Sequence, residues 1–478
     1  MKLPAKPFFR SAVLAAFAAA AGCSVLREAR EAQRAAEPAA AGEPAALGRL
    51  DLRGFSLERL VGFALTNRPE MASARLAVED ARLKMKTIAA DAPLVSDTPW
   101  TAPSISLSGG YSESSPGATA SGGGSWRTYG DPSAALSLNV LLYDFGRNRA
   151  QARAQAERVV SAENALVETG FTVFDETALA YFNYREKCAL YEVALTNEAE
   201  YAEHLVHAEA RYEAGEVNRL NVLKARLDLA TAREKTVSAS NLVVTSGAAL
   251  MDALGVDASR GTCAEVLGAP EGGLSEARRG FAPTTFGIDE TFAFARTNSP
   301  AMQGVRARLR AASRDVDYAL ADLRPTVSAS LGLNWANPFW VWSWGLSAAQ
   351  SVFEGFRRTT AVERATVTLE SAGADVLTAE QALSVKLSLA LATRDNAVEA
   401  LATSRISFAS ARENLALVRE QFTVGDVSRI ELSEAVASYT AALGDIVTAF
   451  YAGQRAEAAL FAIVGSYPVY DERKVGVK

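Results

Sequence analysis

The sequence predicts a mainly α-helical protein that also carries a membrane β-barrel. Its chain is expected to hold a duplicated helix–hairpin–helix unit, long antiparallel coiled-coil helices and four strands. Three observations lead to this fold class. Related segments recur in the same order in both halves, long segments lack proline and have helical periodicity, and four short segments alternate polar and apolar residues.

Composition narrows the functional classes. The chain has 478 residues, a net charge of -6 and a hydrophobic fraction of 49%, which is typical of a folded protein. This charge argues against nucleic acid as a partner. With three cysteines and two histidines, the chain has few ligands for zinc, haem or iron–sulfur centres, and we expect no cofactor.

The N-terminus has the pattern of an export signal over residues 1–22. Lys2, Lys6 and Arg10 form a basic region, and residues 11–21 form a short apolar run that ends in small residues. The run is too short to span a membrane. We therefore expect the chain to be exported and the signal to be removed.

Cys23 directly follows this signal. Residues 20–23 (AAGC) resemble a bacterial lipobox, in which the cysteine becomes the lipidated first residue, although Ala20 stands where leucine is commoner. Plain cleavage is the alternative. Ser24 resembles an outer-membrane sorting residue, and residues 23–55 have the composition of a lipid-anchored tether without a core. No later stretch reaches about 18 consecutive apolar residues, so a membrane crossing would have to use strands.

An internal duplication divides the chain. Four segments have counterparts later: residues 63–69 and 294–300, 103–108 and 325–330, 142–144 and 352–354, and 212–220 and 422–430. We assign residues 56–255 to the first repeat and 287–465 to the second, with an irregular linker at 256–286 and a tail at 466–478. The first repeat is longer in a glycine-rich segment at 112–131, which we interpret as an exposed loop.

Four segments alternate polar and apolar residues with the period of two that is typical of strands. They lie near residues 103–112, 133–143, 326–335 and 340–353. All six tryptophans lie in or beside them, as expected where aromatic rings sit at a membrane interface. A soluble sheet with one buried face is the alternative, but polar faces of Ser, Asn and Gly suit a water-filled lumen better.

Four strands are too few to close a membrane barrel. An open edge in lipid would leave backbone amides unpaired, at several kcal/mol each. Closure therefore needs strands from other copies of the chain. Two copies would supply about eight strands and three copies about twelve.

A very long helix is predicted in each repeat. Residues 147–212 contain no proline and a single glycine, with apolar residues recurring at three and four positions. Such a helix is about 100 Å long, roughly three times a bilayer core. A second helix is expected over 217–254, after a break at Gly215, and the second repeat has the same pattern over 357–422 and then to about 464. Alanine-rich helices of this length pack as coiled coils.

These residues resemble the TolC family of outer-membrane efflux proteins over nearly the whole mature chain. The resemblance rests on the helix starts at 67–69 (NRP) and 298–300 (NSP), on the strand ends at 143–147 and 353–357, and on both glycine turns. Each motif is weak alone, but their order and duplication together are specific. The resemblance implies a homotrimer with a twelve-stranded barrel in the outer membrane and a periplasmic helical tunnel. It also implies docking to a periplasmic adaptor protein of an inner-membrane transporter.

The resemblance further implies a gate at the periplasmic end of the tunnel. Family members carry acidic side chains there, at places where this chain has Glu431 and Glu434. These lie on one helical face, so three copies would form a carboxylate ring that favours cations and raises carboxylate pKa values. A solvated helix face is the alternative. Arg219 and Arg429 are candidate latches, because Val427 occupies the place where family members can have a gate arginine.

The two glycine turns are candidate docking sites for the adaptor. The residues concerned are Ala214, Gly215, Glu216, Val424, Gly425 and Asp426. The resemblance assigns these turns to docking, and glycine permits left-handed backbone and close approach of a partner. An ordinary helix stop is the alternative, and both can hold together.

Histidine and cysteine pairs are the remaining chemical features. His204 and His207 have the spacing of a zinc pair, but without a nearby cysteine or third imidazole we interpret them as surface residues. Cys188 and Cys263 are the thiols that remain if Cys23 is lipidated. An oxidising periplasm permits a disulfide between them, but the sequence does not place their Cα atoms, so both states stay open.

The sequence contains no nucleophile elbow, P-loop or dinucleotide fingerprint, and we expect no enzyme. The prediction is an exit duct that passively conducts drugs or toxic compounds, or secreted proteins, with energy supplied by a partner. The alternative is a non-conducting structural coiled-coil lipoprotein of the envelope. Its weakness is that a scaffold of this kind needs no strands between its helices.

Overall fold

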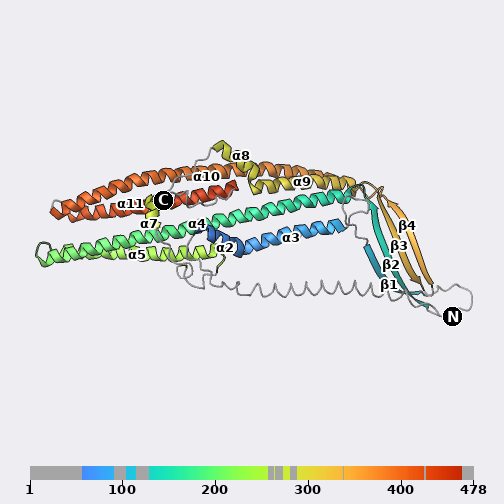
Figure 1. The fold of residues 1–478 in the computed structure, drawn as a ribbon, viewed down its shortest axis with the longest axis horizontal. Coiled ribbons are helices and arrows are strands. Elements are labelled where there is room, and N and C mark those ends of the chain that lie inside the picture. The colour runs from blue at the N-terminus through green and yellow to red at the C-terminus, as the bar shows by residue number, and fades with distance from the viewer. Residues whose placement is uncertain are drawn as a thin grey trace, which may run out of the picture.

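A computed structural model of the chain, shown in Figure 1, describes residues 56–90, 104–114, 129–256, 263, 273–279, 288–336, 339–424 and 427–465. The predicted signal, Cys23, the tether, the tail and most of the linker lie outside the described residues. Trp100, Trp126, Gly425 and Asp426 lie outside them as well.

Two repeats with one order of elements make up the described fold. The first contains α2 (Leu57–Asn67), α3 (Pro69–Ala90), β1 (Ser104–Ser114), β2 (Tyr129–Tyr143), α4 (Arg147–Glu213) and α5 (Arg219–Ala253). The second contains α8 (Ile288–Asn298), α9 (Pro300–Ala321), β3 (Thr326–Ala336), β4 (Phe339–Ala349), α10 (Arg357–Val424) and α11 (Arg429–Val464), and the short α7 (Gly273–Arg279) precedes it. The two longest helices have 67 and 68 residues. The predicted duplication and the long helices are confirmed.

Proline explains why each repeat begins with two helices instead of one. α3 and α9 both start at a proline, Pro69 and Pro300, whose missing N–H is not needed in the first turn. Proline also disfavours helical backbone in the residue before it. Arg68 and Ser299 accordingly have extended ψ angles of 134° and 125°, which end α2 and α8.

The strands form one antiparallel sheet in the order β1-β2-β3-β4 at the end of the molecule opposite the long-helix tips (Figure 1). The register places large apolar residues opposite one another, with Leu333 facing Trp342 and Leu331 facing Trp344. The polar face is held by small side chains, with Ser106 and Ser137 hydroxyls 2.6 Å apart. One face is therefore continuous and apolar, and the other is small and polar, as the alternation predicted.

The strand ends differ from the sequence prediction at two places. β1 and β2 extend to Ser114 and from Tyr129, so both strands enter the segment interpreted as a loop. β4 ends at Ala349, before the predicted end at residue 353. Val352 and Phe353 follow it with 94% and 74% of their surface exposed. The alternating pattern continued into this exposed segment, although it makes no ladder hydrogen bonds there.

The long helix α4 is the element against which most of the others pack. It contacts α2, α3, α5, α7, α9 and α11, and α10 packs along α9 and α11. The pairs α4/α5 and α10/α11 form two helical hairpins whose tips lie at the same end of the molecule (Figure 1). The helices predicted at 217–254 and up to 464 correspond to α5 and α11.

One described helix, α11, is long and apolar enough to cross a membrane by length and composition. Half of its most apolar window is buried inside the protein, and it packs against α10 and α4. Its hydrophobicity is therefore that of a core helix.

The main hydrophobic core surrounds the middle of α4. Tyr184, Leu250, Met251 and Tyr451 are among its fully buried side chains. Polar contacts join α11 to α4 across this region: Arg455 donates to Asn183 at 2.7 Å and to Glu186 at 2.5 Å. These contacts fix one hairpin against the other at mid-length.

The two described cysteines are free thiols. Cys188 lies on α4, and Cys263 packs against Tyr184 and Gly247. Burial raises the pKa of both thiols to about 11, which keeps them protonated at neutral pH and poorly nucleophilic. The disulfide that the sequence permitted is therefore not formed in the structure.

Gly247 gives a test of this packing, because a Cβ there would lie 2.7 Å from the Cys263 Cβ. We expect Gly247→Ala to lower the free energy of unfolding by about 1–3 kcal/mol through overpacking, despite the helix propensity of alanine. Gly444→Ala is the control, since its Cβ would meet only Leu190 at 3.7 Å. Thermal unfolding and the alkylation rate of Cys263 would measure the effect. Equal stability of the two variants with Cys263 unreactive would contradict it.

Candidate functional site

The two hairpin tips form the candidate site. At the first tip, Gly215 takes left-handed backbone with φ 78°. The Glu216 N–H donates to the Arg211 carbonyl and the Gly215 N–H to the Tyr212 carbonyl, both at 3.0 Å. This is a Schellman motif, which satisfies carbonyl groups at the end of α4. The helix-stop interpretation of Gly215 therefore holds, and all three predicted docking residues of this turn are exposed.

The second tip is stabilised by a capping box at the start of α11. The Ser428 N–H donates to Glu431 Oε2 at 3.0 Å, and the Glu431 N–H donates to Ser428 Oγ at 3.4 Å. The pair satisfies two of the donors that a helix N-terminus leaves free. Glu431 thus has a local structural role that the sequence analysis did not assign. Glu434 is exposed one turn later, and Val424 is 81% exposed before the turn.

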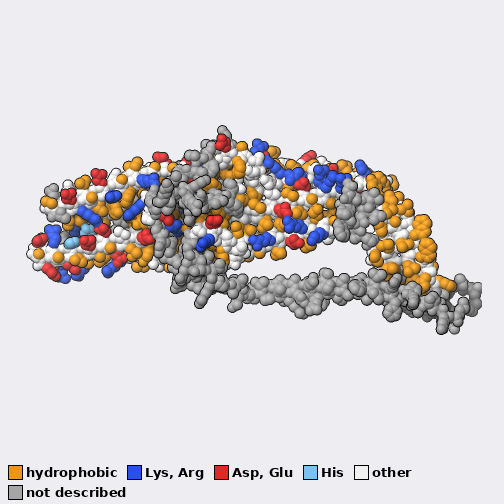
Figure 2. Space-filling model, viewed as in Figure 1, with side chains coloured by type: hydrophobic (Ala, Val, Ile, Leu, Met, Phe, Trp, Pro, Cys, Tyr) orange, Lys and Arg blue, Asp and Glu red, His pale blue; other side chains and the backbone are white. Residues whose placement is uncertain are grey.

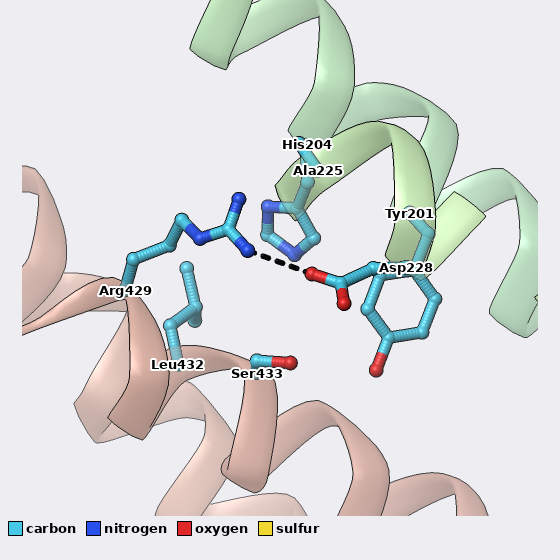
Figure 3. A pocket seen from close by; sticks show the side chains of 7 residues that line it. All are labelled: Tyr201, His204, Ala225, Asp228, Arg429, Leu432 and Ser433. Carbon is cyan, nitrogen blue, oxygen red and sulfur yellow. Dashed lines mark hydrogen bonds and ion pairs between the residues drawn. The ribbon is translucent and has the colours of Figure 1, made fainter. Parts of the chain in front are cut away.

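Arg429 links the second hairpin to the first (Figure 3). It donates from Nη2 to Asp228 Oδ2 at 2.8 Å, the contact drawn in Figure 3. It also donates from Nη1 to the Asn221 carbonyl at 2.9 Å. Asn221 and Asp228 are two helical turns apart, so both acceptors lie on one face of α5. The Arg429 and Asp228 side chains are 29% and 34% exposed, which limits the ion pair to about 1 kcal/mol through solvent screening.

His204 of α4 lies beside this ion pair. His204, Tyr201, Asp228 and Arg429 line one cavity of about 20 Å³, and Figure 3 shows their side chains converging on it. The His204 Nε2 atom is buried without a hydrogen-bond partner. Burial lowers the pKa of His204; Arg419 and His207 lower it further, while Glu200 and Glu203 oppose the shift. The neutral imidazole is therefore the form that fits the packed tip.

The tip does not bring all the predicted residues together. Arg219 is exposed, and its side chain makes no ion pair with the part of the chain that the structure describes. His207 is exposed beside Glu203 at 3.6 Å. The described residues contain no group of three or more potential metal ligands.

Asp228 and His204 are the site residues that sequence reasoning missed. Asp228 had a signal, because it lies on the same face of α5 as Asn221, which occupies the first-repeat position equivalent to Glu431. His204 was considered only with His207. The packing of α11 against α4 is what makes it part of the tip.

Comparison with known families gives this geometry its context. A sequence model described as outer membrane efflux protein matches residues 60–256 and 294–466. The chain belongs to the outer membrane efflux protein family. The two matched segments correspond to the two structural repeats of this efflux protein, and its family places it in the outer membrane among transport proteins.

Solved structures of similar fold support the architecture of this efflux family member. CusC, from a study of transmembrane channel formation, superposes with a TM-score of 0.70 at 19% identity, covering 86% of this chain and 92% of that chain. VceC from Vibrio cholerae superposes with a TM-score of 0.69 at 16% identity, covering 86% of this chain and 96% of that chain. The CmeC outer membrane channel of Campylobacter jejuni superposes with a TM-score of 0.70 at 16% identity, covering 86% of this chain and 85% of that chain. No curated protein matches the sequence significantly.

We expect the Arg429 contact to hold the two hairpin tips together, so that its removal lets them move apart. Arg429→Ala should lengthen and broaden the distance between spin labels on the exposed residues Lys224 and Ser438, because it removes the ion pair to Asp228. Arg226→Ala is the control, since Arg226 pairs with Glu209 inside the first hairpin at 2.8 Å. An unchanged distance in Arg429→Ala would show that the apolar contacts alone hold the tips.

The His204 environment predicts a loosening of the tip in mild acid. A pKa lowered by burial means that the packed state binds the proton less well than an opened state. Packing is therefore complete above the ordinary histidine pKa of about 6.5 and is lost as pH falls below it. The same label distance, measured between about pH 7.5 and 5.5, should increase in the wild type and in His207→Gln. The label distance should not change with pH in His204→Gln. A pH response of His204→Gln equal to that of the wild type would exclude His204 as the cause.

Proposed function

We propose that the protein is a homotrimeric exit duct that crosses the outer membrane through a twelve-stranded barrel and the periplasm through a helical tunnel. It passively conducts the substrates of an inner-membrane transporter, which reach it through a periplasmic adaptor. Drugs or toxic compounds are the substrates proposed first, and secreted proteins are the second class. Cys23 is proposed as the lipidated anchor.

The observation that carries the proposal is the four-stranded sheet with one apolar face and two open edges. β1 and β4 are the edge strands and run in opposite directions. β4 of one copy can therefore pair antiparallel with β1 of the next, so that three copies close an even-numbered barrel of about twelve strands. This closure satisfies the edge amides, which hydrocarbon would otherwise leave unpaired.

The helical part also supports association with other copies. Exposed apolar side chains recur along α5 and α10, among them Leu227 at 66%, Val237 at 61%, Val385 at 67% and Leu389 at 67%. Large apolar surfaces of this kind mark interaction sites. In a trimer they would face helices of the neighbouring copies, and the two hairpins of each copy would form part of one tunnel wall. The similar fold of the CmeC outer membrane channel supports this assignment.

The tips are proposed as the periplasmic mouth, with Glu431 and Glu434 as its carboxylates and Arg429 and Arg219 as its basic residues. The adaptor is proposed to dock at Ala214–Glu216 and at the second turn. Because Glu431 also caps α11, its removal by alanine would confuse loss of charge with loss of the cap. Glutamine at this position keeps a capping side chain while it removes the charge.

Planar-bilayer conductance tests the duct and the mouth together. Wild type should conduct with a preference for cations, and Glu431→Gln with Glu434→Gln should reduce that preference toward equal permeability, because six carboxylates leave the mouth. Glu399→Gln with Glu413→Gln, at two exposed positions of α10, is the charge-matched control. If the Glu431→Gln, Glu434→Gln variant conducts with unchanged selectivity, the proposed carboxylate ring is excluded and the proposed duct is retained. Absence of conductance, even in Arg429→Ala, would favour the non-conducting envelope scaffold.

A further inference from the structure

A basic pocket lies where the helices meet the sheet, at the opposite end of the molecule from the hairpin tips. It has a volume of about 260 Å³ and is lined by Arg149, Arg153 and Arg324 with Phe145, Leu320 and Asp317. Arg149 and Arg153 lie one turn apart on the first turns of α4, and Arg324 follows the end of α9. Figure 2 shows Lys and Arg side chains gathered at this end of the helices, next to the hydrophobic side chains of the sheet.

Several charged side chains near the pocket pair with one another among the described residues. Arg147 lies 3.2 Å from Asp322 and donates to the Tyr318 hydroxyl at 3.0 Å. Among the described residues that line the pocket, the only carboxylate is Asp317, which lies 3.1 Å from Arg314 outside it.

The described lining residues of the pocket therefore carry an excess of positive charge. Arg153 and Arg324 are exposed, and their side chains have no ion pair among the described residues. The described residues that line the pocket include three guanidinium groups and one carboxylate, and that carboxylate pairs with Arg314. A cluster in which two arginines, Arg153 and Arg324, make no ion pair among the described residues is suited to an anion with several acceptor oxygens.

The position of the pocket relative to the membrane follows from the proposed function, on which this step rests. Aromatic side chains lie around the helix ends of the strands, with Tyr143 and Phe145 rings 4.7 Å apart and Phe353 and Phe356 rings 5.6 Å apart, and all of them except the half-buried Phe145 are exposed. Aromatic side chains of barrels sit at the membrane interface. The pocket shares Phe145 with this girdle, so it lies at the level of the lipid headgroups on the periplasmic side.

We propose that Arg149, Arg153 and Arg324 bind the phosphate group of an anionic phospholipid in the leaflet that faces the periplasm. Arginine forks match phosphate oxygens in pairs, and the three side chains approach from the start of α4 and from the segment that follows α9. Phe145 and Leu320, which is 46% exposed, supply apolar contacts for the glycerol and the first acyl carbons. The lipid would thereby join the start of α4 to the end of α9 at the membrane surface.

Native mass spectrometry of the full-length protein, offered equal amounts of phosphatidylglycerol and phosphatidylcholine, tests the site. Wild type should retain phosphatidylglycerol preferentially, and Arg149→Gln with Arg153→Gln should lower that preference about tenfold, since two charge-assisted contacts are lost. Arg324→Gln alone removes no ion pair of the described fold and should lower it in the same direction. Arg59→Gln with Arg412→Gln, at exposed positions away from the sheet, is the control and should retain the wild-type preference.

Two outcomes would overturn the proposal. Equal retention of both lipids by wild type, or equal preference in wild type and in the pocket variants, would show that the arginines do not select a headgroup. Displacement of bound phosphatidylglycerol by inorganic phosphate or glycerol 3-phosphate at low concentration would assign the pocket to a soluble phosphate instead of a lipid. Conductance measured on the same preparations separates this result from failure of the duct, because a conducting protein without lipid preference loses only the lipid site.

Discussion

The hydrogen-bonding demand of the sheet edges is the constraint on which the rest of the structure depends. One chain supplies four strands, and hydrocarbon offers no partner for the amides of β1 and β4. A single copy would therefore be incomplete in a membrane, and in the proposed trimer closure with other copies also determines the arrangement of the helical part. Since α4 and α10 leave the sheet side by side with α3 and α9, a ring of sheets continues as a ring of helices. The exposed apolar residues of α5 and α10 are then the expected property of a wall made from several chains.

Contacts between the two hairpins are unevenly distributed along their length, and this has mechanical consequences. At mid-length, α11 and α4 share the main core together with the contacts of Arg455 to Glu186 and Asn183. Nearer the tip, Thr440 donates to Asn197 at 3.0 Å, and the apolar cluster is small. At the tip itself the connection of α11 to α5 is the partly exposed Arg429 contact with Asp228 and Asn221. The tip can therefore separate at a low energetic cost while the middle of the molecule stays fixed.

The periodic features of the fold were predictable from the sequence, and the contacts between distant segments were not. Helical and strand periods, the helix breaks before Pro69 and Pro300, and the duplication all depend on local residue order. The end of β4 was misjudged because the residues after Ala349 continue an apolar pattern without making a ladder. At the candidate site, Arg429 was identified, but its partner Asp228 lies about 200 residues away in the chain and became visible only through helix packing. The local capping role of Glu431 could have been read from Ser428, which precedes it by three residues.

The distribution of charge along the molecule is more informative than the net charge. A total of -6 would repel the phosphates of a membrane surface, yet the arginines around Phe145 form a local excess of positive charge next to the sheet. The exposed acids Glu431 and Glu434 lie at the opposite end, about 100 Å away along the long helices. At physiological salt, charges that far apart are fully screened from each other. In the proposed duct, each end can therefore be matched to its own surroundings, with basic side chains beside anionic headgroups and acidic side chains at the proposed periplasmic mouth.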